Sequence, residues 1–339
     1  MTETVSLIGA GNMGAAIAQR LLDFSSPPAR PQVTRPLPAS IDGAEQDDML
    51  LAVPPLLDDE PEQHDIVLRV WDLAPRRVEA LVAVGAEAAT SLHDAATSPI
   101  VVTMVPDDTA LEQVALSSGG ILEALPPNGI HLGLSTVSPE LTRELAARYA
   151  HAGKTYLAGT VVGRPDMARQ GRLGVFVAGG RTAKQRVAYI LRRLSAAVGD
   201  LGTQPELAAA AKLAVNHHIA LTILILGESA ELARRCGIDP GEIFRVLQQC
   251  GALGGATWVT YARAAATRSH EQALFPSLLA RKDIGLILAQ AARVGLHLPL
   301  AELFTTRLDA AIAHGNGGKD WSVVATQHAA ECQAVTQPA

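Results

Sequence analysis

The sequence predicts an α/β fold: an N-terminal doubly wound, mostly parallel sheet followed by an all-α C-terminal domain. Over the first two thirds of the chain, short apolar runs alternate with stretches of helical spacing, and this alternation is typical of βαβ units. From about residue 203 the strand pattern stops and only helical spacing continues. We therefore predict an α/β domain over 1–202, a helical domain over 203–330 and a tail over 331–339.

Short runs rich in β-branched and other apolar residues indicate the strands of the first domain. We predict strands over 5–9, 66–72, 100–105, 130–134, 156–160 and 175–178. Helical spacing between them predicts helices over 13–22, 76–84, 109–114, 139–151 and 184–197. In the second domain, Thr203 and Glu206 have the spacing of a capping box, which predicts a long helix from there to about Arg235. Asp239 followed by Pro240 predicts the start of the next helix.

The composition and the charge argue against several classes of protein. Of the 339 residues, 48% are hydrophobic and 18% are charged, which is typical of a globular protein with large cores. Twenty-eight basic residues against 34 acidic ones give a net charge of −6, which disfavours nucleic acid or an anionic membrane as a partner. The longest apolar run, 219–226, is too short to span a bilayer. With three cysteines, no C-x-x-C pair and no signal peptide, the sequence predicts a cytoplasmic protein without a bound metal.

The segment 25–63 fits neither the strand pattern nor the helix pattern. It contains eight of the chain's twenty prolines, and its eight acidic residues against two basic ones account for the whole net charge of −6. Such a composition is typical of an extended or disordered insertion. Because the segment follows the first helix, we expect it at the amino ends of the parallel strands, away from the edge where ligands bind. We therefore predict a mobile or partner-contacting arm instead of an active-site lid.

A glycine-rich loop follows directly after the first predicted strand. Its pattern is G-x-G-x-x-G, from Gly9 to Gly14. The first glycine permits a tight turn, the second lets the backbone approach a pyrophosphate, and the third lets the helix pack closely on the strand. The N–H groups that begin the helix then face the phosphates. The loop predicts a Rossmann-type dinucleotide site, with these residues contacting the cofactor: Gly9, Gly11, Asn12, Met13 and Gly14.

An acidic residue about 20 positions after such a loop ends the second strand and binds the ribose of the cofactor. Asp72 lies 58 positions after Gly14, and without the 39-residue insertion the spacing is 19. This supports both the insertion and the role of Asp72 as the ribose ligand. A carboxylate repels the 2′-phosphate of NADP, so Asp72 favours NAD, although Arg76 and Arg77 lie close enough to leave NADP open.

Two polar residues, Lys212 and Asn216, are four positions apart on one face of the long helix. The residues around them are apolar, and a lysine in such surroundings either reaches solvent along the helix or has a partner or function. Desolvation lowers the pKa of a lysine toward the range that is useful for proton transfer. His217 and His218 follow directly, but no other residues with metal-ligand spacing accompany them, so we interpret them as structural.

Seven motifs occur in the order in which they are found in a known family. They are Gly9 to Gly14, Met104-Val105-Pro106-Asp107-Asp108, Ser135-Thr136-Val137-Ser138-Pro139, Lys212-Leu213-Ala214-Val215-Asn216, Glu228-Ser229-Ala230-Glu231, Lys282-Asp283, and Gly315 to Asp320 with Trp321. On these motifs the chain resembles the β-hydroxyacid dehydrogenases, the group of 3-hydroxyisobutyrate dehydrogenase and tartronate semialdehyde reductase, which also includes 6-phosphogluconate dehydrogenase-like proteins. The resemblance covers nearly everything except the insertion.

The resemblance implies roles for the motif residues. Lys212 would be the general acid/base, and Asn216 would position the substrate beside it. Ser135 and Thr136 would bind the substrate carboxylate, with Thr136 also near the nicotinamide. Val105, Pro106 and Lys282 would contact the cofactor. Gly163 and Arg164, in the second substrate loop, would contact the substrate. Family members are commonly dimers or tetramers, so the resemblance also implies a homo-oligomer formed through the helical domain.

Three positions depart from the family pattern. Gly133 stands where the family usually has an aspartate before the Ser-Thr pair. The second substrate loop, usually Ser-Gly-Gly, is Val162-Gly163-Arg164-Pro165, and Arg164 either clamps a carboxylate or faces solvent. Glu206 and Ala208 replace two glycines ahead of the lysine. We therefore expect a substrate other than 3-hydroxyisobutyrate itself.

The sequence thus predicts an NAD(P)-dependent oxidoreductase that interconverts a small β-hydroxyacid and its semialdehyde or keto acid. One alternative is C=N reduction, as in the related imine reductases, for a substrate with an imine in place of the hydroxyl carbon. Imine reductases usually carry aspartate or tyrosine at the position of Lys212, which counts against this alternative. Another alternative is a non-catalytic cofactor-binding protein with an altered substrate loop.

Overall fold

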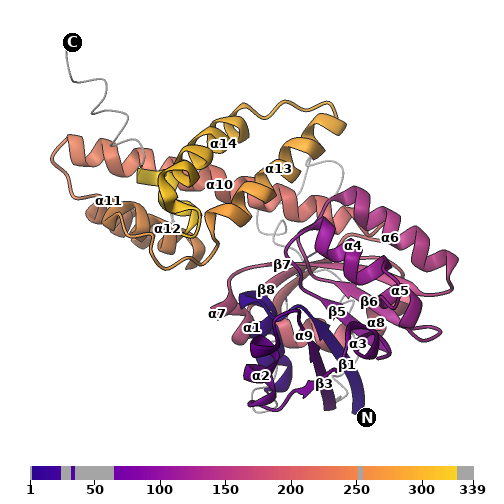
Figure 1. Cartoon of the computed structure of the whole chain (residues 1–339). Coiled ribbons are helices and arrows are strands. Elements are labelled where there is room, and N and C mark those ends of the chain that lie inside the picture. The colour runs from indigo at the N-terminus through magenta and orange to yellow at the C-terminus, as the bar shows by residue number, and fades with distance from the viewer. Residues whose placement is uncertain (1, 24–31, 35–64, 251–253, 255, 327–339) are drawn as a thin grey trace. The chain divides into compact units, whose positions relative to one another are not determined.

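The computed structural model describes residues 2–23, 32–34, 65–250, 254 and 256–326. The chain divides into two compact units, Met1–Lys212 and Leu213–Ala339. The first is built around a sheet, and the second consists of helices (Figure 1). The predicted fold class, a doubly wound mostly parallel sheet followed by an all-α region, is confirmed.

Among the described residues, nine strands form the sheet of the first unit, in the order β2-β9-β8-β7-β6-β5-β1-β3-β4. Six of them, from β7 to β4, are parallel, whereas β8 runs antiparallel to β7 and pairs in parallel with β9. From β1 the chain builds first toward β3 and β4 and later toward β5, β6 and β7. The switch point of the sheet therefore lies between β1 and β5. The strands are β1 (Thr2–Ile8), β2 (Gln32–Thr34), β3 (Asp65–Trp71), β4 (Glu87–Ala88), β5 (Ile100–Thr103), β6 (Ile130–Gly133), β7 (Thr155–Val162), β8 (Leu173–Ala178) and β9 (Ser195–Asp200).

Helices cover both faces of this sheet (Figure 1). On one face α1 packs with α2, α7 and α9 over a core of aliphatic side chains. On the other face α3, α4, α5 and α6 enclose a second core. The helices are α1 (Asn12–Leu22), α2 (Pro75–Val82), α3 (Leu92–Ala96), α4 (Asp108–Leu116), α5 (Ile121–Ala124), α6 (Pro139–His151), α7 (Pro165–Arg169), α8 (Arg181–Arg186) and α9 (Ala188–Leu194).

The contact between α1 and the strands beside it leaves no space for side chains at two glycines. A Cβ atom on Gly14 would lie 2.0 Å from the carbonyl oxygen of Gly9, and one on Gly9 would lie 2.4 Å from that of Met104. Gly9 also has φ +98, which L-residues with side chains rarely adopt. These two glycines therefore fix how closely α1 approaches the ends of β1 and β5.

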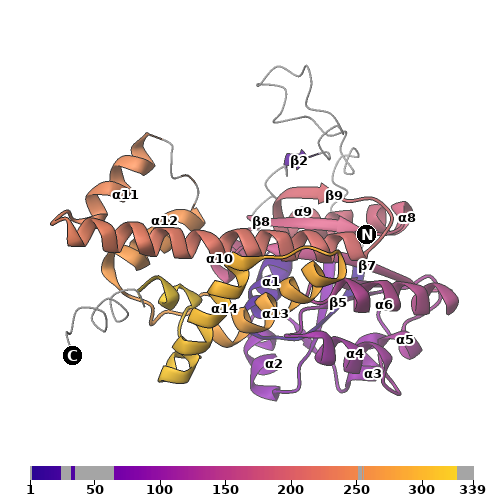
Figure 2. The same ribbon diagram turned by 90° about the horizontal axis from the view of Figure 1, so that it is seen from above.

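In the second unit, four helices and a short 3₁₀ segment pack around the long helix α10 (Figure 2). Trp321 lies at the centre of this core, edge-on to Phe275 and Phe304, and its indole N–H donates to the hydroxyl of Tyr261 over 2.8 Å. The elements are α10 (Glu206–Arg235), α11 (Pro240–Gln249), α12 (Ala256–Thr267), α13 (Ser277–Arg293), α14 (Pro299–Ala311), η2 (Ile312–Asn316) and η3 (Trp321–Thr326).

By length and composition alone, α10 is the one helix among the described residues that is apolar enough to cross a membrane. The core helix of a folded domain passes the same test, and Leu213, Ile223 and Leu224 of α10 are buried in the core of the second unit. The uninterrupted apolar run 219–226, the only one considered in the sequence analysis, therefore underestimates the apolar length of this helix.

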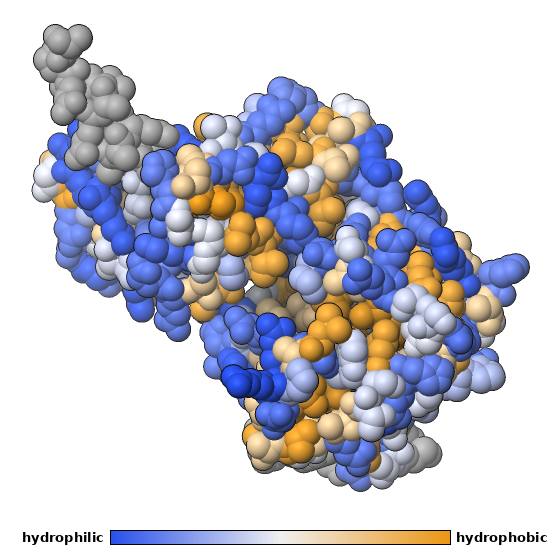
Figure 3. Space-filling model, viewed as in Figure 1, coloured by the Kyte–Doolittle hydropathy of each residue, from blue (hydrophilic) through white to orange (hydrophobic). Residues whose placement is uncertain are grey.

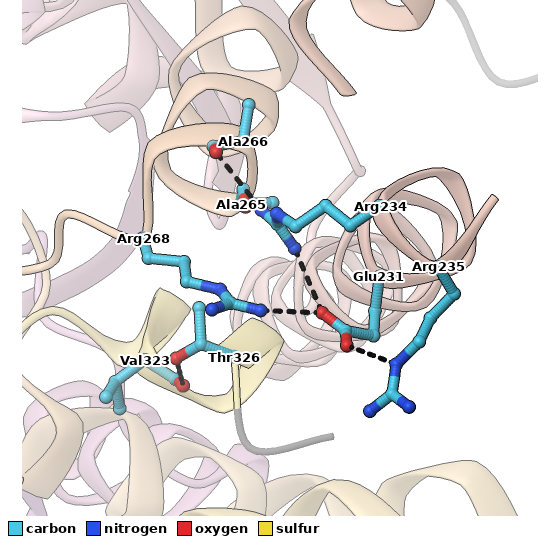
Figure 4. Close-up of polar contacts among 8 residues, drawn as sticks. All are labelled: Glu231, Arg234, Arg235, Ala265, Ala266, Arg268, Val323 and Thr326. Atoms are coloured by element: carbon cyan, nitrogen blue, oxygen red, sulfur yellow. Dashed lines mark hydrogen bonds and ion pairs between the residues drawn. The ribbon is translucent and has the colours of Figure 1, made fainter. Parts of the chain in front are cut away.

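An ion-pair cluster joins the end of α10 to the end of α12 (Figure 4). Glu231 accepts hydrogen bonds from Arg234, Arg235 and Arg268. Arg234 also donates to the backbone carbonyls of Ala265 and Ala266. Burial by itself would raise the pKa of Glu231, but the hydrogen bonds from Arg235 and Arg268 bring it below its usual value. The second Glu of the predicted family motif Glu228 to Glu231 thus connects two helices of this unit.

The division between the units lies ten residues beyond the predicted boundary at 202/203. Helix α10 begins at Glu206, later than the capping-box position Thr203 predicted, and its first turn belongs to the first unit. The hydroxyl of Thr160, at the end of β7, donates to the carbonyl of Ala208 over 2.8 Å, and Ala208 is fully buried in the first unit. This contact between distant residues leaves no pattern in the local sequence.

The predicted helix over 184–197 is wrong in its last part. Helices α8 and α9 end by Leu194, and Ser195–Asp200 form strand β9 beside β8. The alanines at the start of this strand continue helical spacing, but pairing with β8 determines their structure, as is common for strands. The two-residue strand β4 also went unpredicted.

Three residues of the insertion 25–63 join the sheet. Gln32–Thr34 form β2, which pairs in parallel with β9 at the edge of the sheet. The interpretation of the whole segment as an arm is therefore wrong for these residues. The rest of the insertion lies outside the described residues.

Substituting the two glycines of the α1 loop should have different effects. We expect Gly14→Ala to lower the midpoint of thermal unfolding, because its Cβ would force α1 off the sheet, and overpacking of this kind costs about 1–3 kcal/mol or more. Gly11→Ala is the matched control, since a Cβ there meets nothing within 4 Å. Thermal denaturation followed by circular dichroism measures both. An equal loss in the two variants would contradict the close-contact argument.

Candidate active site

The predicted site residues of the first unit gather along one edge of its sheet. Strands β1, β3, β5, β6 and β7 are parallel, so their carboxyl ends lie at the same edge, where ligands bind in folds of this type. The segments that follow these strands carry the predicted residues of the first unit before α10: Gly9 to Gly14, Asp72, Val105 and Pro106, Ser135 and Thr136, and Gly163 and Arg164.

The first turn of α1 suits a pyrophosphate. Gly11 is its N-cap residue, and among the described side chains none caps the helix or places a carboxylate in its first turn. The N–H groups that begin a helix are therefore directed at this position, where the helix dipole favours an anion. Asn12 is exposed, and Gly11 and Met13 are half-buried, so the loop is accessible to a ligand.

The carboxylate of Asp72 lies against this glycine loop. It accepts a hydrogen bond of 2.7 Å from the backbone N–H of Ala10 and one of 2.8 Å from that of Ala74. Arg77 Nη1 lies 3.5 Å from the same carboxylate. Two carboxylate oxygens offer about four acceptor positions, so hydroxyl groups can also be bound here. The structure thus brings the predicted phosphate and ribose ligands together, as a dinucleotide requires.

Two backbone hydrogen bonds hold the loops after β5 and β6 together. The N–H of Val105 donates to the hydroxyl oxygen of Ser135 over 2.8 Å, and the N–H of Ser138 donates to Asp108 over 2.9 Å. Ser135 is 2% exposed, whereas Thr136 is half-buried. Sequence reasoning assigned Asp108 no role, since a contact across 30 residues has no local signal.

The departure at Gly133 has a steric explanation. A Cβ at this position would lie 2.4 Å from the hydroxyl of Tyr156, on the neighbouring strand β7. The aspartate that the family usually has here would collide with this tyrosine.

Three buried polar side chains, from β5, β6 and α6, are connected by hydrogen bonds. The ring of His131 contacts the hydroxyls of Thr103 and Tyr149 at 2.9 and 2.7 Å. Burial lowers the pKa of His131 to about 3, so this histidine is neutral and structural.

Arg164 holds a fixed position in the altered substrate loop. It follows Gly163, whose φ of +139 is a conformation that glycine adopts readily. Its Nε and Nη2 donate to the two oxygens of Asp166 over 3.2 and 3.1 Å, and its side chain is 14% exposed. The hydrogen bond from Arg164 lowers the pKa of Asp166. The pair presents an arginine and an ionised aspartate together.

Lys212 ends the part of α10 that belongs to the first unit, one turn after Ala208. It is 9% exposed, so the helix face predicted from its apolar neighbours is indeed buried. The hydrogen bond from Thr160 to Ala208 fixes this turn on the sheet. The alanine that replaces a family glycine at 208 is fully buried, and its carbonyl accepts the hydrogen bond from Thr160. Residue 208 therefore packs on the sheet.

Asn216 and Lys282 of the second unit meet at one carboxylate. Asn216 Nδ2 donates to Asp283 Oδ2 over 2.6 Å, and Lys282 Nζ lies 2.7 Å from Asp283 Oδ1. Asn216 and Asp283 are 4% and 2% exposed. Elsewhere in this unit His218 stacks edge-on against Trp258. Within the described residues, no three His, Cys, Asp or Glu side chains are grouped to hold a metal.

Two family models match the chain in succession. One, the NAD binding domain of 6-phosphogluconate dehydrogenase, matches residues 59–202. The other, NAD-binding of NADP-dependent 3-hydroxyisobutyrate dehydrogenase, matches residues 207–327. The first match begins within the last residues of the insertion 25–63. The glycine loop before it is placed beside Asp72 by the pairing of β1 with β3.

A curated relative extends this result. The uncharacterized oxidoreductase YfjR of Bacillus subtilis is 35% identical over 258 residues, which are 76% of this chain and 90% of the relative. The chain belongs to the β-hydroxyacid dehydrogenase family. It is an NAD(P)-binding oxidoreductase of the class that acts on CH–OH groups. Another relative, 2-(hydroxymethyl)glutarate dehydrogenase of Eubacterium barkeri, is 26% identical over 77% of this chain and 87% of its own length.

Solved structures share the fold. A 3-hydroxyisobutyrate dehydrogenase from Salmonella typhimurium superposes with a TM-score of 0.74 at 21% identity, covering 95% of this chain and 99% of that one. An imine reductase from Myxococcus stipitatus in complex with NAD⁺ has a TM-score of 0.58 at 19% identity, covering 96% and 98%. At these identities the likeness establishes the architecture and leaves the substrate open.

Removing the charge of Asp72 should shift the preference between the two cofactors. In Asp72→Asn the side chain keeps an acceptor but no longer repels a 2′-phosphate. We expect the dissociation constant for NADH to rise about tenfold, the loss of one charged hydrogen bond, while that for NADPH stays equal or falls. Titration of cofactor fluorescence measures both constants. Arg77→Ala is the control for the neighbouring cation, and an unchanged NADH to NADPH ratio in Asp72→Asn would contradict the assignment.

Proposed function

We propose that this protein interconverts a small β-hydroxyacid and its semialdehyde or keto acid, with Lys212 as the general acid/base. The observation that carries the proposal is the burial of Lys212. The preceding turn of α10 is hydrogen-bonded through Ala208 to Thr160 of β7, toward the sheet edge where the predicted cofactor loops lie. Burial disfavours the charged form of an amine, which suits a group that must give and take a proton near neutral pH.

The division of labour follows from the residues present. A bound nicotinamide supplies the hydride chemistry. Lys212 would take the proton of the substrate hydroxyl during oxidation and return it to the carbonyl oxygen during reduction. Thr136 would contact the substrate with its half-buried hydroxyl, while Ser135, whose oxygen is bound to the Val105 N–H, would hold the loop in position. A direct contact of Ser135 with substrate stays a prediction.

We propose a carboxylate as the second recognition feature of the substrate. Arg164 lies in the loop after β7 at the same edge of the sheet as Thr136. Its guanidinium already donates to both oxygens of the Asp166 carboxylate, which is the bidentate geometry in which arginine binds carboxylates. A substrate carboxylate would compete with or add to this pair, and recognition by arginine in place of the family's Ser-Gly-Gly favours an acid larger than 3-hydroxyisobutyrate.

A panel of substrates tests the proposal. Oxidation of 3-hydroxyisobutyrate, L-serine and 2-(hydroxymethyl)glutarate and reduction of 2-hydroxy-3-oxopropionate are followed by NAD(P)H absorbance, beside cyclic imines and the amide analogue of each acid. We expect turnover of at least one acid and none of its amide. Turnover of imines alone would favour the imine reductase alternative, and tight cofactor binding without turnover would favour a non-catalytic protein.

Replacing Lys212 should abolish the chemistry and spare the cofactor site. Lys212→Met keeps the apolar volume but removes the proton carrier, so we expect kcat on the best substrate to fall about 10²–10⁴-fold. The dissociation constant for NADH should stay within about twofold, because the cofactor loops remain intact. Steady-state kinetics and fluorescence titration measure the two effects.

A second buried lysine is the matched control for this variant. Lys184 is 3% exposed and donates to Asp200 and to the Gly202 carbonyl. Lys184→Met should lower thermal stability and leave kcat of the folded enzyme nearly unchanged. Full turnover in Lys212→Met would refute the mechanism.

We also propose a homo-oligomer formed through the helical unit. Its surface exposes large apolar side chains, among them Ile225 and Leu232 of α10 and Val246 of α11, at 61%, 68% and 55%. Figure 3 shows apolar groups interspersed with polar ones over one face of this unit. Sedimentation equilibrium should give a mass of at least twice the 35.5 kDa of one chain, reduced by Leu232→Glu. A 35.5 kDa species at micromolar concentration would contradict this proposal.

A further inference from the structure

We propose that Asp283 is a positioning residue for the reaction: one oxygen of its carboxylate fixes the amide of Asn216 so that Asn216 presents its carbonyl oxygen, and the other restrains Lys282. The inference rests on the proposed function of Lys212 and Asn216 and adds a residue that acts through them. It is carried by the hydrogen bond of 2.6 Å from Asn216 Nδ2 to Asp283 Oδ2.

The burial of this pair indicates more than packing. Asp283 is 2% exposed and Asn216 4%, and their hydrogen bond joins α13 to α10 within the second unit. A buried carboxylate is costly unless it is paired and hydrogen-bonded, and well-packed apolar residues often serve stability as well or better. Asp283 is therefore an expensive choice for connecting α10 to α13, which suggests that orientation of Asn216 is its use.

The orientation of the amide follows from donor and acceptor chemistry. The two ends of an asparagine amide have nearly the same shape, so packing alone does not choose between them. The oxygens of a carboxylate accept hydrogen bonds, and Asn216 Nδ2 donates to Asp283 Oδ2, so the NH₂ group of Asn216 faces Asp283. The carbonyl Oδ1 is left as the atom that Asn216 offers to other groups.

A carbonyl at this position suits a lysine base. Asn216 is one helical turn after Lys212 on the same face of α10. An acceptor there takes an N–H of the neutral amine, which leaves the lone pair of that amine directed toward the substrate hydroxyl whose proton it accepts. The reversed amide would direct its own N–H at the lone pair and compete with the hydroxyl. Asp283 thus selects the productive orientation.

The second oxygen of Asp283 forms an ion pair with Lys282 and so restrains the position of that side chain. Lys282 Nζ lies 2.7 Å from Oδ1 in an ion pair without hydrogen-bond geometry, and the lysine side chain is 25% exposed. Lys282 is the residue of α13 predicted to contact the cofactor. One buried carboxylate therefore bears on both of the predicted ligand-contacting side chains of this unit.

The variant Asp283→Asn tests the inference, because it keeps the shape and a hydrogen-bonding partner but no longer dictates which end of Asn216 faces it. We expect kcat on the best substrate to fall at least tenfold, with KM changed less than threefold and the unfolding midpoint within a few degrees of wild type. Asp320→Asn is the control: Asp320 is 3% exposed and accepts from the backbone N–H groups of Leu274, Phe275 and Ser322. This variant should lose thermal stability and keep kcat.

A measurement without substrate separates this inference from the proposed function. The side-chain amide of Asn216 is assigned by nuclear magnetic resonance through its loss in Asn216→Asp. In wild type we expect one of its protons to be shifted downfield and slow to exchange, and in Asp283→Asn to return toward ordinary values. Unchanged amide protons, a wild-type kcat, or a loss of kcat only in step with thermal stability would each overturn the inference. If the protein turned over no substrate of the panel, the proposed function would be refuted. The amide protons would then still show whether Asp283 orients Asn216.

Discussion

The approach of helix α1 to the ends of β1 and β5 determines where the other parts of the predicted cofactor site lie. It is possible only because Gly9 and Gly14 have no side chains, since a Cβ on either would lie within 2.4 Å of a backbone carbonyl. The same loop supplies the Ala10 N–H that binds Asp72, so the end of β3 is tied to it. The end of β5 continues into Val105, whose N–H is bound by Ser135 after β6. Four neighbouring strand ends are thereby connected by hydrogen bonds from backbone N–H groups to the side chains of Asp72 and Ser135.

Each unit buries a charged side chain to which we assign a role in the proposed reaction. The sheet unit buries Lys212 at its last residue, and the helical unit buries Asp283 beside Asn216. Other buried charges, such as Lys184 with Asp200, have partners that complete an ordinary structural pair. Asp283 differs because its partners are two residues that the family resemblance independently assigns to substrate and cofactor. A structural ion pair requires no such coincidence, and a positioning residue does.

The sequence predicted those features that depend on local patterns. The alternation of strands and helices, the glycine loop, and the helix starts at Pro139 and Pro240 all follow from neighbouring residues, and the structure has them. Features that depend on distant contacts could not be predicted. Strand β9 has alanines that suit a helix until it pairs with β8, and the hydrogen bond from Thr160 to Ala208 joins residues that are 48 positions apart. Counting residues without the insertion placed Asp72 at the end of the second strand, and the structure has its carboxylate beside the glycine loop; its role as ribose ligand stays a prediction.

The departures from the family pattern are not spread evenly over the site. The residues proposed for proton transfer and cofactor contact, Lys212, Asn216 and Lys282, are kept, and Asp283 contacts two of them. Two of the changes lie at the end of β6 and in the loop after β7, where Tyr156 occupies the space of the usual aspartate and Arg164 with Asp166 replaces a small flexible loop. The third, Glu206 and Ala208 in place of two glycines, lies in the first turn of α10 ahead of Lys212. Loss of function would relax both sides alike, since neither would be under any chemical constraint. Keeping the side chains proposed for proton transfer while changing the loops proposed for substrate recognition is instead the expected result of a change in substrate with the reaction retained.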